Sequence, residues 1–134
     1  MKPKSISILI IFTWLLILFT LCASPPETIT ISAEDNTETS ILHVKDTLNI
    51  LLPANPTTGY SWQLANGDTT ILTLLEKQYL NHRVKPKRVG SGGTRKLIFE
   101  ARRKGNTSLK LTYIQTFQPN PQPARVFSLK VTVR

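Results

Sequence analysis

The sequence predicts an all-β fold of about seven or eight short strands, for three reasons. No segment shows a sustained helical period of apolar residues. Short runs rich in branched and aromatic residues recur along the chain, and some of them alternate between apolar and polar positions. Turn residues separate these runs, and glycine and proline are concentrated in three loops. These features are typical of a β-sandwich or a β-barrel.

The expected strands follow one another with short connections. A short alternating piece at 28–31 is a candidate edge strand, and turns are expected at 66–68 and 104–106. The remaining strand segments are 40–45, 47–52, 60–64, 69–80, 95–101, 107–112 and 126–133. Alternation in the last two predicts one inward face made of Leu109, Leu111 and Tyr113 and another made of Phe127, Leu129, Val131 and Val133.

The first 24 residues have the layout of a targeting segment. A short basic start is followed by an almost wholly apolar run at 6–21 and then by small residues. This pattern indicates a cleaved signal peptide, and the length of the run also fits an uncleaved membrane anchor. Residues 19–22 resemble a bacterial lipoprotein box, which makes Cys22 a candidate lipidation site. All three alternatives export a single domain of residues 25–134, to the periplasm, the extracellular space or the outer side of a membrane.

Composition argues against an enzyme. The one cysteine lies in the targeting segment, so the domain has no disulfide and no thiol nucleophile. The two histidines, His43 and His82, have no spacing that suggests a metal site. We therefore expect no catalytic residue, no metal and no cofactor.

The chain is basic, with a formal net charge of +9. Ten lysines and arginines fall between Lys77 and Lys104, and only Glu100 opposes them. Aromatic residues do not interleave with this run as a base-stacking platform requires, so a nucleic-acid partner is not expected. The charge instead favours attraction to an acidic partner or a membrane surface.

One short stretch, which we call the first loop, is expected to organise the rest: Asn55-Pro56-Thr57-Thr58-Gly59-Tyr60. It lies between two strand segments. Pro56 restricts its own φ and pushes Asn55 towards extended geometry, and Gly59 can adopt positive φ to close the turn. Two uncharged threonines occupy the tip. The stretch predicts a stiff, neutral hairpin tip, which loses little entropy on binding.

The first loop and a second motif resemble those of the chagasin-type inhibitors of papain-like cysteine proteases. The first loop matches that family's Asn-Pro-Thr-Thr-Gly-aromatic signature, and Gly90-Ser91-Gly92-Gly93 matches its Gly-x-Gly-Gly loop. The third family loop, Arg-Pro-Trp or Arg-Pro-Phe, is degenerate here. Gln115-Thr116-Phe117 keeps only the aromatic residue. The resemblance spans about 41–133 of this chain.

The resemblance implies an immunoglobulin-like β-sandwich that acts as a reversible protease inhibitor and is expected to be a monomer. Thr57, Thr58 and Gly59 would enter the catalytic centre, while Asn55 and Pro56 would hold the loop's shape. Gly90 to Gly93 would grip one rim of the cleft, and Phe117 would anchor the opposite side, with Gln115 and Thr116 as further contacts. The degenerate third loop also leaves an alternative open, a secreted or surface-anchored binding module whose loops recognise another ligand or receptor.

Overall fold

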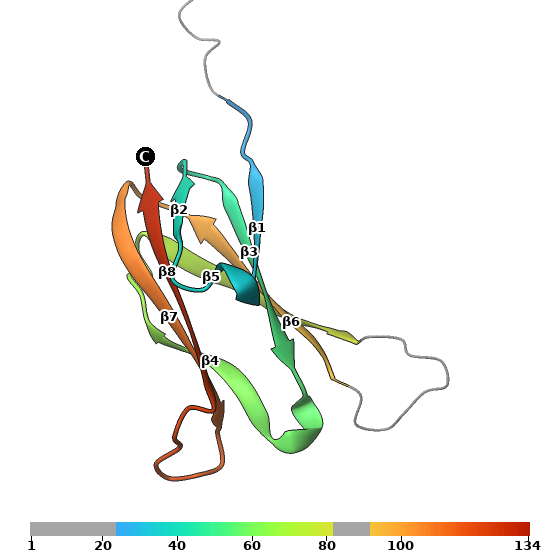
Figure 1. Ribbon diagram of the computed structural model, residues 1–134. Coiled ribbons are helices and arrows are strands. Elements are labelled where there is room, and N and C mark those ends of the chain that lie inside the picture. Colours follow the sequence, from blue (N-terminus) through green and yellow to red (C-terminus); the bar gives the residue numbers. More distant parts are fainter. Residues whose placement is uncertain (1–23, 82–91) are drawn as a thin grey trace, which may run out of the picture.

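Two four-stranded sheets enclose one apolar core in the computed structural model, which describes residues 24–81 and 92–134 (Figure 1). The first sheet has the order β1 (Thr28–Ser32), β3 (Thr47–Ala54), β6 (Gly93–Ala101) and β5 (Leu72–Asn81). The second has the order β2 (Thr39–Leu42), β8 (Arg125–Val133), β7 (Gly105–Gln115) and β4 (Tyr60–Asn66). Two short 3-10 helices, η1 (Ala33–Asp35) and η2 (Pro56–Thr58), interrupt the connections. Two separate sheets make a sandwich, so the barrel alternative is excluded.

The core consists of alternate residues from the facing strands. Both predicted inward faces are confirmed: every member of the sets on β7 and β8 is buried. The first sheet adds Leu48, Ile50 and Leu52 from β3 and Leu97, Phe99 and Ala101 from β6. Burial of this continuous apolar layer is the main stabilising contribution in a domain without a disulfide.

The two N-terminal strands lie at sheet edges and pair in parallel. β1 pairs with β3, which confirms the expected edge strand, and β2 pairs with β8 of the other sheet. Between these edges, η1 links one sheet to the other. The remaining pairs described are antiparallel.

A buried carboxyl, that of Asp46, holds the chain around the start of β3. It accepts hydrogen bonds from the backbone N–H groups of Glu27 (2.9 Å) and His43 (2.7 Å). Burial raises the pKa of Asp46, but these hydrogen bonds and the nearby His43 ring lower it more. The net pKa is therefore below its ordinary value of 3.8. The ionised form of Asp46 stabilises the fold.

Three expectations about connections are wrong. The turn placed at 104–106 ends two residues earlier, at 104, because Gly105 already pairs with Val133 as the first residue of β7. The strand placed at 69–80 begins at Leu72, since the Asp68 side chain accepts hydrogen bonds from Thr70 and holds the preceding residues in a turn. The first loop is not a hairpin tip, because β3 and β4 belong to different sheets.

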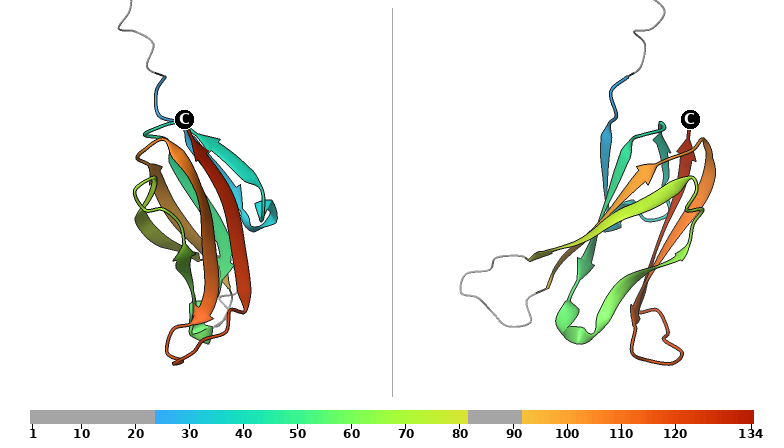
Figure 2. Two further views of the ribbon diagram at one scale, coloured as in Figure 1. Left: turned by 90° about the vertical axis from the view of Figure 1, so that its left-hand side faces the viewer. Right: turned by 180° about the vertical axis from the view of Figure 1, so that it is seen from behind.

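The first loop and the connection between β7 and β8 lie at the same end of the sandwich, opposite the C-terminus (Figures 1 and 2). We call residues 115–124 the third loop. β6 also begins at this end, where Gly93 pairs with Ala54 and Asn81. Four residues of the basic run, Arg83, Lys85, Lys87 and Arg88, lie outside the described residues. Arg102, Arg103 and Lys104 follow the far end of β6, away from the loops.

Residues 1–23 of the targeting segment, including Cys22, lie outside the described residues, as does His82. In the two described ranges, no helix is long and apolar enough to cross a membrane.

Candidate functional site at the loop end of the sandwich

The first loop is a tight turn fixed by its own residues. Asn55 is extended (φ −134°, ψ 99°), as expected before a proline. Residues Pro56–Thr58 form one 3-10 turn, and Gly59 ends it in the left-handed region (φ 76°, ψ 0°). The predicted extended geometry of Asn55 and the positive φ of Gly59 are therefore confirmed.

Both threonine hydroxyls donate hydrogen bonds back into the loop. Thr57 Oγ1 donates to the Asn55 side-chain oxygen (2.6 Å), and Thr58 Oγ1 donates to the Asn55 backbone carbonyl (2.7 Å). A hydroxyl has one proton but two lone pairs. Both threonines are exposed, so the tip has an uncharged surface with hydroxyl oxygens that retain acceptor capacity.

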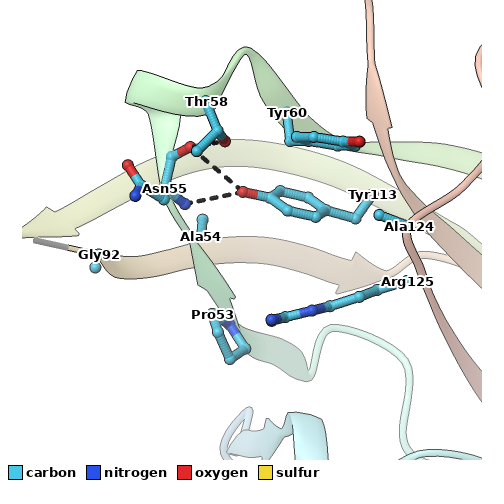
Figure 3. A pocket seen from close by; sticks show the side chains of 10 residues that line it. Pro53, Ala54, Asn55, Thr58, Tyr60, Gly92, Tyr113, Ala124 and Arg125 are labelled. Carbon is cyan, nitrogen blue, oxygen red and sulfur yellow. Dashed lines mark hydrogen bonds between the residues drawn. The ribbon is translucent and has the colours of Figure 1, made fainter. Parts of the chain in front are cut away.

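An aromatic cluster supports the loop from below (Figure 3). The Tyr113 hydroxyl accepts a hydrogen bond from the Asn55 N–H (2.9 Å) and donates one to the Asn55 carbonyl (3.4 Å). The Tyr113 ring lies 5.2 Å from that of Tyr60 and 5.0 Å from that of Trp62, between centroids. The Trp62 indole N–H donates to the carbonyl of Pro53 (3.0 Å). The loop is thus attached to both sheets.

The Gly-x-Gly-Gly motif is described only in part. Gly90 and Ser91 lie outside the described residues. Gly93 is buried, and a Cβ at this position would lie 2.5 Å from the Tyr79 hydroxyl and 2.5 Å from the Leu80 carbonyl oxygen. Gly92 is exposed, and a Cβ there would make only an ordinary contact with the Ala54 carbonyl (3.6 Å). Gly93 is therefore a packing residue, whereas Gly92 remains accessible to a partner.

The third loop folds against the tip of the first loop. Phe117 is 70% exposed, yet its ring lies over Gly59, where an added Cβ would come within 2.6 Å of Cε1. Gln115 Nε2 donates a long hydrogen bond to the Thr58 carbonyl (3.5 Å), and Gln118 Nε2 donates to Gln115 Oε1 (2.5 Å). The family resemblance implied that both loops contact the same cleft, but it did not predict that they touch each other.

A hollow of about 410 Å³ lies beneath the tip, between the two sheets. Its walls come from four segments: Pro53 to Asn55 with Thr58 and Tyr60, then Gly92 and Gly93, then Tyr113, and finally Ala124 and Arg125. Figure 3 shows the Arg125 side chain extending from β8 beneath the Tyr113 ring towards Pro53.

Sequence reasoning missed three features of this site: the role of Tyr113, the Phe117–Gly59 contact and the position of Arg125. The alternating pattern indicated that Tyr113 faces inwards, but its hydrogen-bond partner lies 58 residues away. No local signal connects such positions. Within the described ranges, no group of three His, Cys, Asp or Glu side chains could hold a metal ion.

Comparison with known proteins matches this chain to one family of peptidase inhibitors and to a relative of similar length. The model of the chagasin family of peptidase inhibitors, family I42, matches residues 41–131. Amoebiasin-1 of Entamoeba histolytica is 32% identical over 102 residues, which are 75% of this chain and 96% of that protein.

Two solved structures resemble this chain over most of its length. The crystal structure of the cysteine protease inhibitor EhICP2 from Entamoeba histolytica matches with a TM-score of 0.75 at 21% identity, over 84% of this chain and all of that one. The structure of PbICP-C, solved in complex with falcipain-2, matches with a TM-score of 0.51 at 20% identity, over 85% of this chain and 96% of that one. At these identities, the similarity establishes the sandwich fold.

Proposed function

The chain belongs to the chagasin family of peptidase inhibitors, and we propose that it inhibits papain-like cysteine proteases by seating its first loop in their active-site cleft. Its function is reversible inhibition of cysteine proteases, and it is not an enzyme. The observation that carries the proposed mechanism is the shape of the first loop, which is closed by its own hydrogen bonds before any partner is present.

The loop's chemistry suits a cleft with a cysteine–histidine pair at its floor. The pair reacts as a thiolate beside an imidazolium, which is a hydrogen-bond donor. The outward lone pairs of Thr57 and Thr58 can accept from such donors, and an uncharged tip avoids burying an unpaired charge. Inhibition follows because the tip fills the cleft and excludes substrate and water.

The same geometry explains why the inhibitor is not cut. Protease clefts bind substrate segments in an extended conformation, so that one carbonyl faces the nucleophile. Pro56–Thr58 is instead a 3-10 turn, and the Asn55 and Pro56 carbonyls accept hydrogen bonds from Thr58 and Gly59. These bonds resist opening of the turn into a substrate-like strand.

The other two loops would contact the rims of the cleft. Gly92, with Gly90 and Ser91, would bring backbone close to one rim. Phe117 would bury its exposed ring against the other rim, with Gln115 and Thr116 beside it. Because the Phe117 ring lies over Gly59, the aromatic anchor and the tip would enter the cleft side by side. We propose that the inhibitor acts as a monomer.

We also propose that the domain is exported, since the first 24 residues combine a basic start with an apolar run. The segment has three alternative fates: cleavage, retention as a membrane anchor, or lipidation at Cys22. Detergent partition of the wild-type chain and of Cys22→Ser distinguishes the three. Lipidation predicts that only the wild type partitions into detergent, and an uncleaved anchor predicts that both do.

The mechanism is tested by titration against papain and cathepsin-like enzymes with Thr58→Glu. Thr58 is exposed, so the variant should stay folded and lose about 1 kcal/mol with its hydroxyl hydrogen bond. Inhibition should fall by at least about a hundredfold, because the carboxylate would be buried without a partner. Thr39→Glu, at an exposed position of β2, is the matched control and should inhibit like the wild type. Equal inhibition by both variants would exclude the first loop as the inhibitory element.

A further inference from the structure

We propose that Arg125 is the charged contact of this inhibitor, and that its partner is a carboxylate on the rim of the protease cleft. The inference rests on the proposed function and deepens it by naming the kind of protease that is bound best. It starts from an absence in the sequence: the third loop lacks the arginine that the related pattern carries before its aromatic residue.

The structure places another arginine at the same end of the molecule. Arg125 is the first residue of β8, directly after the third loop, and it lines the hollow beneath the first loop together with Asn55 and Thr58. Its side chain extends towards Pro53 rather than away from the site (Figure 3). In that view the guanidinium lies beside Pro53, across the hollow from Thr58.

Arg125 has no partner of its own in the described part of the chain. The ion pairs there join His43 to Asp46 and Arg102 to Glu100, both remote from the loops. No hydrogen bond of the described residues involves the Arg125 side chain, whose guanidinium has five donors. A planar guanidinium group whose N–H donors have no partner is suited to bidentate pairing with a carboxylate.

The surroundings favour an acidic partner. The described segments at this end, residues 53–61, 79–81, 92–95 and 113–125, contain no Asp or Glu. Their other cation, Arg95, lies over the Tyr79 ring, 5.6 Å from its centroid. Among the residues described as lining the hollow, Arg125 is the charged one.

The Arg125 side chain is exposed in the free inhibitor and would become buried in the complex with a protease. An ion pair on an open surface contributes little, because water and salt screen it. Once the tip enters a cleft, water is excluded from the hollow around Arg125, and a pair formed there is screened less. The same charge would also attract an acid-rimmed protease before contact and raise the association rate.

The experiment compares Arg125→Gln with the wild type against papain-like proteases that have acidic or neutral cleft rims. Association and dissociation rates are measured at low and high salt. With an acid-rimmed enzyme, affinity should fall roughly ten- to hundredfold, with a smaller salt dependence. With a neutral-rimmed enzyme, the variant should match the wild type.

Lys130→Gln is the control for net charge, since Lys130 is exposed on β8 away from the loops. It should leave affinity unchanged. A charge swap completes the test: Arg125→Glu should regain affinity for a protease variant whose rim carboxylate is replaced by lysine.

The experiment distinguishes failure of the Arg125 proposal from failure of the proposed function. If the wild type inhibits but Arg125→Gln behaves as Lys130→Gln does on every enzyme, the role of Arg125 is refuted and the proposed function stands. If the wild type inhibits no papain-like protease, the proposed function and this inference both fail.

Discussion

Gly59→Ala is the substitution for which the structure gives the most definite expectation. Gly59 has φ 76°, a region that costs a residue with a Cβ about 1–2 kcal/mol. Alanine also restricts the unfolded chain, which offsets about 0.4–1 kcal/mol of that cost. We therefore expect a net loss of about 1 kcal/mol in the free energy of unfolding, or a Tm lower by roughly 4–8 °C.

The effect on inhibition should be larger than the effect on stability. The new Cβ would lie 2.6 Å from Phe117 Cε1, so the ring must move. Because Phe117 is 70% exposed, it can rotate into solvent at little cost to folding. The joint surface of tip and aromatic ring would nevertheless be lost, and we expect inhibition to weaken by about tenfold or more.

Urea unfolding followed by tryptophan fluorescence measures the first effect, and titration of a papain-like protease measures the second. Trp62 is the one tryptophan after the targeting segment, so the signal reports a core residue that contacts the loop's support. Gly92→Ala is the matched control, since its Cβ has room and stability should hardly change.

A double-mutant cycle with Phe117→Ala separates backbone strain from ring displacement. In the Phe117→Ala background, Gly59→Ala should cost the same stability but little further inhibition. Wild-type stability and inhibition for Gly59→Ala would refute the reasoning, because neither the strain nor the contact could then matter.

The remaining predictions concern the residues that support the loops and the fold. Tyr113→Phe removes the hydroxyl that pairs with the Asn55 backbone and should cost about 1–3 kcal/mol in urea unfolding and weaken inhibition. Gly93→Ala should destabilise by a similar amount, since Tyr79 would have to move, and a melting curve unchanged from the wild type would contradict this. Asp46 has a lowered pKa when folded, so its contribution is present above its unfolded pKa of 3.8 and is lost as pH falls through the folded value. Asp46→Asn should therefore be less stable than the wild type at neutral pH, and the difference should shrink in acid.

Much of the fold was predictable because strand alternation is a local signal. Tyr113, Phe127 and Val131 were placed on inward faces from their spacing alone, and all are buried. The conformation of the first loop was also predictable, since Pro56 and Gly59 restrict their own backbones.

Other features depend on contacts between distant segments, which periodicity does not encode. The first loop was expected to close a hairpin, but the pairing of β4 with β7 rather than β3 places it between sheets. Gly93 looked like a contact residue, yet its lack of a side chain serves the packing of Tyr79. The role of Arg125 was not predicted, because its sequence context does not distinguish it from the other basic residues. Only the fold shows that it lines the hollow beneath the tip.

The central claim is that residues 57–59 occupy the catalytic centre of a papain-like protease. The most direct measurement is a crystal structure of the inhibitor bound to such a protease, with its catalytic cysteine replaced by alanine to prevent turnover. We predict that Thr57, Thr58 and Gly59 lie in contact with that alanine and the catalytic histidine, with the 3-10 turn intact. A complex in which these three residues face solvent would contradict the account.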